Sequence, residues 1–566
     1  MFKAVYFSLT ALLFICCSRT PYTNLPKDST KYNVIDTALV VSAHPLSSEV
    51  GKAILLKGGN AIDAAIAVQF ALAVVHPSAG NIGGGGFMVV RMNNGSYSSL
   101  DFRETAPKLA SEDMYLDENK NIIEGLSLNG HLAVGVPGTV DGMLKAFEKY
   151  GSLSWNEIVQ PSIDLAKNGF KLTQLEADGL NYFNSKKLKF NSIIPSYFDR
   201  DWSKGDTLVL DDLAYTLSLI RDHKRAGFYE GENAEKIIQE MSRSGGLISK
   251  QDLIDYTSKW RIPIVGTFKD YKLISMGPPS SGGLCLYQIL KMIEPFDLRK
   301  MGFHSNAYIH LIVEAEKRAF ADRSKYLGDP DFIRIPIEQL MDSNYLAQRM
   351  LDFDSLFAST VDSIHPGEFN FAESEETTHY SIVDSYGNAV SVTTTLNSSY
   401  GSGVVVGNAG FLLNNEMDDF SSKPGTPNLY GLVGGFANSI QPNKRMLSSM
   451  TPSILEKNNE LFMVVGTPGG STIITGVLQT ILNVIEHNFS MQQAVSEGRF
   501  HHQWKPNSIK MEENKFDSST IEQLEKMGHT LKFVHSMNRV DAILKKLDGT
   551  FEPGADPRGD DSYSGF

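Results

Sequence analysis

The chain has 566 residues, of which 42% are hydrophobic and 21% charged, and its formal net charge is −13 at pH 7. This composition is typical of a globular protein with enough chain for a large buried core. The acidic balance argues against nucleic acid as a partner, because phosphate binding requires a basic face. No GxxxxGK[ST], HExxH or GxSxG motif occurs, so the sequence carries no nucleotide-binding or zincin signature.

The first 17 residues predict an export signal that is separate from the fold. Lys3 gives a weakly positive start, and residues 4–15 form an apolar run that is too short to span a bilayer. Cys16 and Cys17 follow, as in the signal of a bacterial lipoprotein, whose acylated first residue is a cysteine. We expect an exported protein, periplasmic or anchored to the outer membrane, with Cys17 or Cys16 lipidated. A simply cleaved signal and an uncleaved anchor are the alternatives.

Residues 60–75 predict a buried helix, because they are apolar nearly all round and begin at a candidate cap, Asn60. Gly83–Gly86 come next, followed by a predicted strand at 87–91. This glycine run precedes a strand instead of joining a strand to a helix, so it fails the context test for a phosphate loop. A tight crossing of the backbone is the better interpretation.

Arg103 follows the predicted strand 98–100. An arginine at the end of a strand is by default a solvated charge or half of an ion pair, although its fork geometry also suits a bidentate grip on a carboxylate. Farther along, a helix predicted from Asn306 to Arg323 carries His310 and Glu314 at i,i+4 spacing. With no third ligand apparent, this pair does not predict a metal site.

The stretch that begins at Thr377 is the most informative part of the chain. An acidic, weakly patterned run from about 352 to 376 leads into two runs of β-formers, 377–383 and 389–396, whose Gly/Asn turn predicts a β-hairpin. Antiparallel pairing sets Thr377 opposite about Thr395. One interpretation is an ordinary hairpin with Ser and Thr on its solvent-exposed face. The other is self-cleavage before Thr377, which would free an α-amine with a pKa of about 7.7–8.0 to act as the base for its own hydroxyl.

Three further segments follow the hairpin. After a strand expected at 404–406, residues 410–420 predict a strand that ends in carboxylates, either a solvated loop or a receptor for an ammonium group. Residues 421–436 form a long Gly/Pro-rich loop of the kind that often serves as a lid. Residues 464–472 predict a strand, a glycine turn and a helix, and the free N–H groups at such a helix start form an anion site.

The residues Thr377-Thr378-His379-Tyr380-Ser381-Ile382-Val383-Asp384 and Gly387-Asn388-Ala389-Val390 resemble the start of the small subunit of γ-glutamyltranspeptidases, members of the N-terminal-nucleophile hydrolases. The resemblance runs from about Val41 to Phe566. It includes the Arg103 motif, the Gly-Pro-Pro-Ser-Ser-Gly-Gly segment at 277–283 and the paired serines of the segment 442–452.

The resemblance implies a role for each of several residues. For the reaction, it implies self-cleavage between Glu376 and Thr377, Thr377 as the nucleophile, Thr395 as the residue that orients it, and Gly469 and Gly470 as the oxyanion hole. For the substrate, it implies that the α-carboxylate is held by Arg103, Ser448 and Ser449, and the α-ammonium group by Asn397, Glu416 and Asp419. Tyr430 is implied as the aromatic cover in the lid loop. No metal or other cofactor is implied. The expected donors are glutathione and other γ-glutamyl compounds, and the expected acceptors are water, amino acids and dipeptides.

The resemblance also implies an α+β fold, a four-layer αββα sandwich. We expect a signal at 1–17, a large fragment at 18–376 and a small catalytic fragment at 377–566, the two fragments forming one interlocked domain. Two other functions stay open. A relative on the same scaffold could deacylate cephalosporin-type side chains, and an uncleaved lipoprotein could use the same pocket only to bind its ligand.

Overall fold

The computed structural model describes residues 34–566 except 196, 199, 368–377, 424–425, 427–431 and 433–434. The chain divides into two compact units, Met1–Val34 and Ile35–Phe566. The predicted signal with Cys16 and Cys17 lies outside the described residues. Within the described ranges, no helix is both long and apolar enough to cross a membrane.

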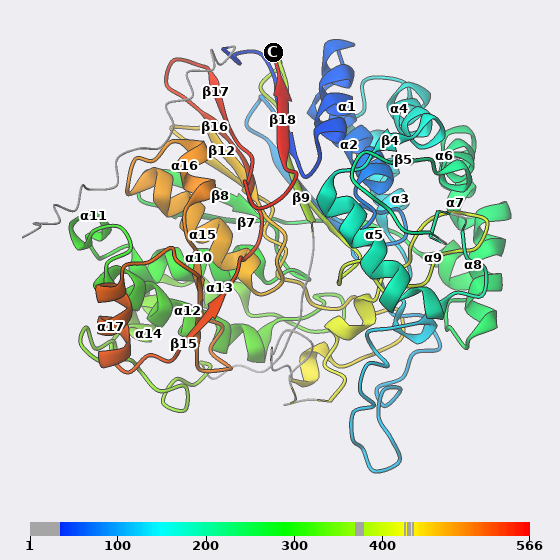
Figure 1. The fold of residues 1–566 in the computed structure, drawn as a ribbon. Coiled ribbons are helices and arrows are strands. Elements are labelled where there is room, and N and C mark those ends of the chain that lie inside the picture. The colour runs from blue at the N-terminus through cyan, green and yellow to red at the C-terminus, as the bar shows by residue number, and fades with distance from the viewer. Residues whose placement is uncertain are drawn as a thin grey trace, which may run out of the picture. The chain divides into compact units, whose positions relative to one another are not determined.

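Two antiparallel sheets lie face to face at the centre of the second unit (Figure 1). In spatial order, the strands of the first sheet are β18 (Ser562–Gly565), β1 (Leu39–Ser42), β9 (Thr378–Val383), β10 (Ala389–Thr395), β2 (Gly85–Arg91), β3 (Tyr97–Asp101) and β6 (Lys259–Arg261). Those of the second sheet are β17 (Phe551–Gly554), β16 (Asp541–Lys545), β12 (Glu460–Gly466), β11 (Ser453–Lys457), β8 (Tyr271–Ser275) and β7 (Ile264–Phe268). Segments before and after the predicted cleavage site contribute strands to both sheets.

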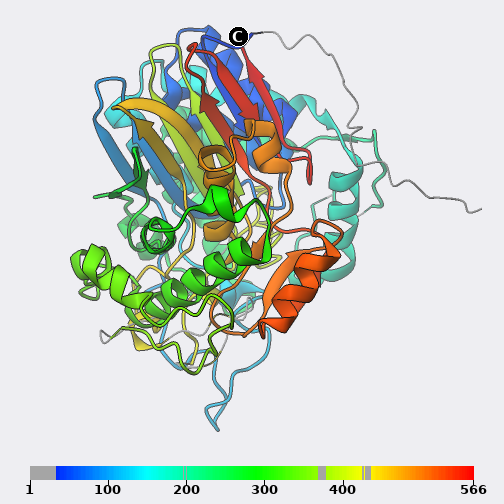
Figure 2. The ribbon, with the colours of Figure 1, turned by 90° about the vertical axis from the view of Figure 1, so that its left-hand side faces the viewer.

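Each sheet is covered by helices on its outer face (Figure 2). The first sheet packs against α1 (Pro45–Leu56), α2 (Ala61–Val75) and α3 (Thr139–Tyr150), while α4 (Trp155–Asn168) packs on α2 and α6 (Asp211–His223) packs on α4. The second sheet packs against α10 (Gly282–Ile293) and α15 (Thr472–Ile485), and α12 (Asn306–Tyr326) packs on α10.

Alternation along the strands divides the core into layers. Val40 and Met88 lie in the cluster shared with the outer helices, whereas their neighbours Val41 and Phe87 lie in the cluster between the two sheets. Successive side chains of a strand point to opposite faces, so a fully apolar strand buries both of its faces. The four-layer αββα prediction is therefore confirmed.

The other elements lie around these layers. The helices are α5 (Gln174–Lys186), α7 (Ala226–Tyr229), α8 (Gly231–Arg243), α9 (Lys250–Asp255), α11 (Leu298–Met301), α13 (Ile337–Leu340), α14 (Ser343–Arg349), α16 (Met491–Ser496) and α17 (Ser518–Lys526). The strands are β4 (Phe170–Lys171), β5 (Thr207–Leu208), β13 (Phe500–His501), β14 (Ile509–Glu512) and β15 (Leu531–Val534). Short 3₁₀ turns are η1 (His131–Ala133), η2 (Leu188–Phe190), η3 (Glu416–Asp419) and η4 (Phe436–Asn438).

The predicted hairpin and the helix predicted at residues 60–75 are confirmed. β9 pairs with β10 from Val383 opposite Ala389 to Thr378 opposite Thr394. Thr377, the predicted partner of Thr395, lies outside the described residues. Helix α2 begins after Asn60, whose side chain accepts from the N–H groups of Ile62 and Asp63.

Two predicted strands after the hairpin are wrong. Residues 404–406 contribute only the isolated bridge from Val405 to Leu412, and the carboxylates at the end of 410–420 lie in η3. Gly401, Gly403 and Gly410 all have positive φ values, so the chain turns repeatedly and cannot extend into a sheet.

At Gly466 the second sheet packs closely against the hairpin. A Cβ at this position would lie 2.3 Å from the ring of His379, and that ring is fixed by contacts of 3.0 Å to the hydroxyls of Thr393 and Ser381. Gly466→Ala should therefore lower the free energy of unfolding by about 1–3 kcal/mol, as overpacking does in tight cores. The urea midpoint measures this effect. Leu547→Ala, at a fully exposed position, is the matched control, and an unchanged midpoint in Gly466→Ala would contradict the packing described.

Candidate active site

The described end of the hairpin is a buried, hydrogen-bonded corner. Thr395 Oγ1 accepts from the Asn397 N–H at 2.6 Å, and the Asn81 side chain donates to the Thr395 carbonyl at 2.8 Å. Asn397 has a φ of 70°, a left-handed conformation that asparagine tolerates better than most residues. These contacts fix Thr395 beside the start of β9. Glu376 and Thr377 themselves lie outside the described residues.

Gly469 and Gly470 form a sharp turn between β12 and α15, with φ values of 133° and 62°. Across the described part of the chain, neither backbone N–H has a hydrogen-bond partner. Gly469 also lines the same cavity of about 550 Å³ as Thr378. The turn therefore places two unused donors at a helix start, close to the residue that follows Thr377, and such donors can stabilise an oxyanion.

Arg103 lies at the centre of a buried cluster of charges. Its two terminal nitrogens form ion pairs with Glu416 and Asp419, and Nη1 lies 3.8 Å from Glu104. All four side chains are inaccessible to solvent. Sequence reasoning assigned Arg103 to one end of a substrate and Glu416 and Asp419 to the other, whereas here the three residues pair directly with one another.

The cluster holds more carboxylates than cations, and this changes the pKa values. Burial lowers the pKa of Arg103, but the charges of Glu416, Asp419 and Glu104 more than offset it, so the net shift is upward. Burial raises the pKa of Glu104 to about 8 and that of Glu416 well above its usual range. Within the described residues, both Glu104 oxygens and Glu416 Oε2 are buried without a hydrogen-bond donor. Such a site suits a ligand that brings a cation with several N–H groups.

Ser448 and Ser449 adjoin the cluster. Arg103 donates to the carbonyls of Met446 and Leu447 at 3.3 and 3.2 Å, immediately before the two serines. Ser449 Oγ accepts a hydrogen bond from Arg323 of α12. The structure thus brings Arg103, Ser448, Ser449, Glu416, Asp419 and Asn397 into one region. Tyr430, the predicted cover, lies outside the described residues.

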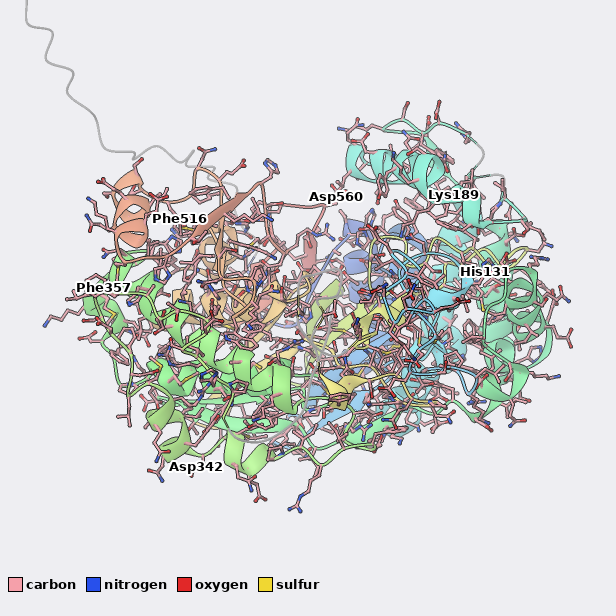
Figure 3. The ribbon with its side chains drawn as sticks, turned by 90° about the horizontal axis from the view of Figure 1, so that it is seen from below. His131, Lys189, Asp342, Phe357, Phe516 and Asp560 are labelled. Carbon is pink, nitrogen blue, oxygen red and sulfur yellow. The ribbon has the colours of Figure 1, made fainter. Side chains whose placement is uncertain are left out.

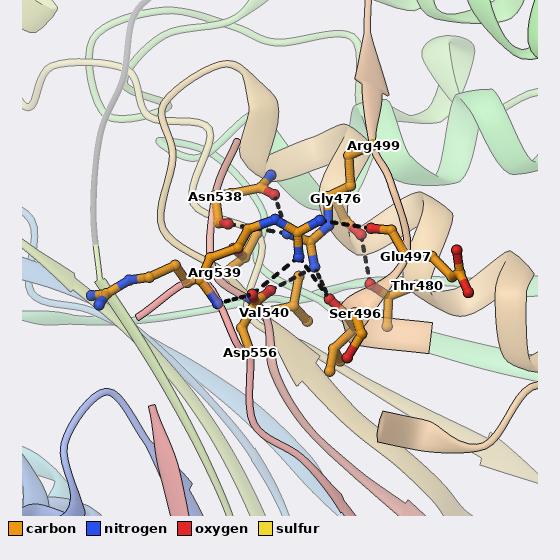
Figure 4. Close-up of polar contacts among 12 residues, drawn as sticks. Gly476, Thr480, Ser496, Glu497, Arg499, Asn538, Arg539, Val540 and Asp556 are labelled. Carbon is orange, nitrogen blue, oxygen red and sulfur yellow. Dashed lines mark hydrogen bonds and ion pairs between the residues drawn. The ribbon is translucent and has the colours of Figure 1, made fainter. Parts of the chain in front are cut away.

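Two features of this region were missed by sequence reasoning. Glu104 follows Arg103 directly, but no pattern in the neighbouring sequence indicates that its carboxylate is buried. Asn538 contacts the glycine turn from a distant segment, because a Cβ on Gly469 would lie 2.6 Å from the Asn538 Cβ. Asn538 donates to the Thr472 carbonyl at 2.7 Å. Arg499 in turn donates to the Asn538 carbonyl and side-chain oxygen, both at 3.0 Å (Figure 4).

The sequence also did not reveal that a third residue, His529, lies beside His310 and Glu314, because His529 comes from a distant part of the chain. His310 Nδ1 lies 2.7 Å from His529 Nε2, while Lys317 and Arg318 each lie 2.7 Å from the Glu314 carboxylate. Two cations already neutralise Glu314, so we interpret this cluster as a structural network.

Comparisons with known proteins agree with this geometry. Residues 47–566 match the model of the γ-glutamyltranspeptidase family. The chain is 46% identical to the glutathione hydrolase proenzyme of Escherichia coli strain K12 over 532 residues, which cover 93% of this chain and 92% of that protein. It is similar in structure to a cephalosporin acylase from Bacillus halodurans, with a TM-score of 0.84, 25% identity and coverage of 98% and 99%. It is also similar to γ-glutamyltranspeptidase of Helicobacter pylori, with a TM-score of 0.56 and 43% identity over 60% of this chain and 97% of that one.

The raised pKa of Glu104 predicts a pH-dependent stability. The folded state holds this proton up to a pH of about 8, whereas the unfolded state releases it near 4.5. Between these values the native state binds more protons, so stability falls as the pH rises. The loss is at most about 1.4 kcal/mol per pH unit.

Glu104→Gln removes the titrating group and should flatten this decline. The free energy of unfolding of both proteins, measured by denaturant titration at several values from pH 5 to 8.5, should diverge in favour of the variant as the pH rises. Glu552→Gln, on the partly exposed strand β17, is the control. Parallel curves for wild type and Glu104→Gln would show that Glu104 is already ionised at neutral pH.

Proposed function

Since this chain belongs to the γ-glutamyltranspeptidase family, we propose that it cuts itself between Glu376 and Thr377 and then transfers γ-glutamyl groups from glutathione or related donors through Thr377. The acceptor is water in the hydrolase reaction and an amino acid or dipeptide in the transferase reaction. The single observation that carries this proposal is the buried cluster around Arg103, where three carboxylates face one cation.

The cluster suits the α-amino acid end of a γ-glutamyl group. Its ammonium supplies donors to Glu416 and Asp419, with Asn397 beside them, and its carboxylate takes the place of those acids on Arg103 and accepts from Ser448 and Ser449. Exchange of one set of ion pairs for another avoids leaving an unpaired charge in the interior. A substrate that lacks either charge would leave buried groups unpaired and would be rejected.

The chemical steps follow from the hairpin and the glycine turn. The free α-amine of Thr377 accepts the proton of its own Oγ, which attacks the γ-carbonyl carbon. The N–H groups of Gly469 and Gly470 stabilise the oxyanion, and Thr395 orients the Thr377 amine and hydroxyl. The amine of the donor departs, and an ester joins the glutamyl group to Thr377. The lid residue Tyr430 covers the site during these steps.

The remaining proposals concern processing and location. We propose that fragments 18–376 and 377–566 stay together after cleavage, because both contribute hydrogen-bonded strands to each of the two sheets. Export with lipidation of Cys17, or of Cys16, is supported by the apolar run and the cysteines that follow it.

Replacement of the nucleophile tests the cleavage. Thr377→Ala should give a single intact and inactive chain, since no hydroxyl is available to attack the preceding carbonyl. Thr377→Ser, which keeps a hydroxyl, is the matched control and should still yield two bands on a denaturing gel. Two fragments from Thr377→Ala would refute the proposal.

Donor choice separates the γ-glutamyl reaction from the cephalosporin-type deacylation of related acylases. Wild-type protein should release nitroaniline from γ-glutamyl-p-nitroanilide and act far more slowly on glutaryl-p-nitroanilide, which lacks the ammonium group. Asp419→Asn should raise the donor KM by about tenfold or more, because one charged hydrogen bond is lost. Faster turnover of the glutaryl compound would instead favour the acylase.

A further inference from the structure

The segment 277–283 carries part of the family resemblance but has no role in the reaction proposed above. It joins β8 to α10 and runs along the segment that holds the paired serines. The Ser448 N–H donates to the Pro279 carbonyl at 2.8 Å, and the Ser281 N–H donates back to the Ser448 carbonyl at 2.6 Å. We use the name carboxylate clamp for the three residues proposed to hold the donor α-carboxylate, Arg103, Ser448 and Ser449.

A glycine lets the two segments lie this close. A Cβ on Gly282 would lie 2.3 Å from Thr451 Oγ1 and 2.6 Å from the Met450 carbonyl oxygen. The Ser280 hydroxyl donates to the same Met450 carbonyl at 2.6 Å. Glycine is the usual residue where another segment must approach the backbone closely. The serines of the carboxylate clamp therefore lie on a backbone that is packed and hydrogen-bonded on one side.

Arg323 reaches the carboxylate clamp from the helices over the second sheet. It lies in the last turn of α12, which packs on α10. In Figure 3 this helical layer is green and carries the label of Asp342, the residue that caps α14. Tyr345 of α14 donates to Asp322 of α12 at 2.6 Å. Because Arg103 follows β3 of the first sheet, one arginine approaches the clamp from each half of the sandwich.

The Arg323 guanidinium joins two hydroxyls in the interior. Its side chain is inaccessible to solvent. Its Nε donates to Ser281 Oγ at 2.7 Å, and its Nη2 donates to Ser449 Oγ. The two hydroxyl oxygens lie 3.3 Å apart. Since a planar guanidinium fixes the directions of its N–H groups, both serines are held in one relative position.

The hydrogen atoms of these hydroxyls can be assigned from their partners. Ser281 Oγ donates to the Ser448 carbonyl at 2.7 Å, which commits its only hydrogen. Arg323 has no acceptor atom, so Ser449 accepts from it and keeps its own hydrogen to donate. The contact between the Ser449 and Ser281 oxygens is longer than about 3.0 Å, the usual upper limit of an O–H···O bond. Ser449 can therefore turn its hydrogen toward a carboxylate at small cost.

The charge of Arg323 strengthens this donor. Hydrogen bonds in a chain polarise one another, so a hydroxyl that accepts from a cation donates more strongly to an anion. A carboxylate held by Arg103 and Ser449 would be bonded to one cation directly and to a second cation through one hydroxyl.

We propose that Arg323 and Ser281 are positioning residues for the donor, and that they orient the Ser449 hydroxyl so that its hydrogen points to the α-carboxylate of the γ-glutamyl group. This inference rests on the proposed function. Neither residue contacts the donor in this assignment, and both act through Ser449. Their loss should weaken donor binding, whereas the chemical steps at Thr377, which do not involve Ser449, should keep their rate.

A double-mutant cycle tests this assignment. Hydrolysis of γ-glutamyl-p-nitroanilide is measured for wild type, Arg323→Gln, Ser449→Ala and the double variant. Arg323→Gln should raise the donor KM about tenfold and change kcat by no more than about twofold, because one charged hydrogen bond is lost. The double variant should have the KM of Ser449→Ala alone, since Arg323 acts only through Ser449.

A second donor separates positioning from general damage to the fold. γ-Aminobutyryl-p-nitroanilide keeps the ammonium group but lacks the α-carboxylate, so Arg323→Gln should leave its kcat/KM unchanged. Arg318→Gln, the matched control, removes another buried arginine of α12, which pairs with Glu314 and Asp352. It should leave the KM for both donors unchanged. Ser281→Ala should raise the KM for γ-glutamyl-p-nitroanilide about threefold.

The assignment is overturned if Arg323→Gln or Ser281→Ala keeps the wild-type donor KM. It is also overturned if the effects of Arg323→Gln and Ser449→Ala multiply in the double variant, or if Arg323→Gln slows both donors equally. Ser281→Ala, a smaller change, decides the outcome where Arg323→Gln gives no folded protein. Wild-type protein that does not hydrolyse γ-glutamyl-p-nitroanilide would instead contradict the proposed function itself.

Discussion

The position of β9 is the constraint on which the rest of the site depends. β9 pairs with β1 from Tyr380 to Val383 and with β10 from Thr378 to Val383, so its first described residue, Thr378, is held opposite Thr394 within a seven-stranded sheet. The proposed nucleophile, Thr377, directly precedes this paired residue in the sequence. The proposed cleavage ahead of Thr377 would break no part of the pairing of β9 with β1 and β10.

A second constraint is the imbalance of buried charge around Arg103. A carboxylate without a partner is costly in the interior, and a protein tolerates it where a ligand or a proton can compensate. Glu104 and Glu416 both have raised pKa values for this reason. Under the proposed function, the cost of this charge imbalance is offset by a ligand that carries an ammonium group next to a carboxylate. Stability and specificity are thus two results of the same arrangement.

Local sequence patterns correctly predicted the elements whose structure follows from a short stretch of sequence. The apolar run after Asn60 and the β-formers on either side of the Gly/Asn turn gave α2 and the hairpin correctly, because burial on both faces and turn chemistry are visible in short windows. The strands expected at 404–406 and 410–420 failed, since glycines with positive φ turn the chain there. Residue resemblance supplied the candidate site, and the structure brings most of its described members together. Contacts made across the chain, such as Asn538 on Gly469 and His529 beside His310, leave no local pattern and could not be predicted.

In the proposed mechanism, Thr377 is both the new N-terminus and the residue that carries the glutamyl group. The most direct measurement is the intact mass of the polypeptides in active protein, taken after a rapid acid quench with and without a γ-glutamyl donor. We predict a fragment that begins at Thr377 and gains the mass of one γ-glutamyl group only when the donor is present, with the added group on Thr377. Active protein found as a single unbroken chain, or a glutamyl group on another residue, would contradict it.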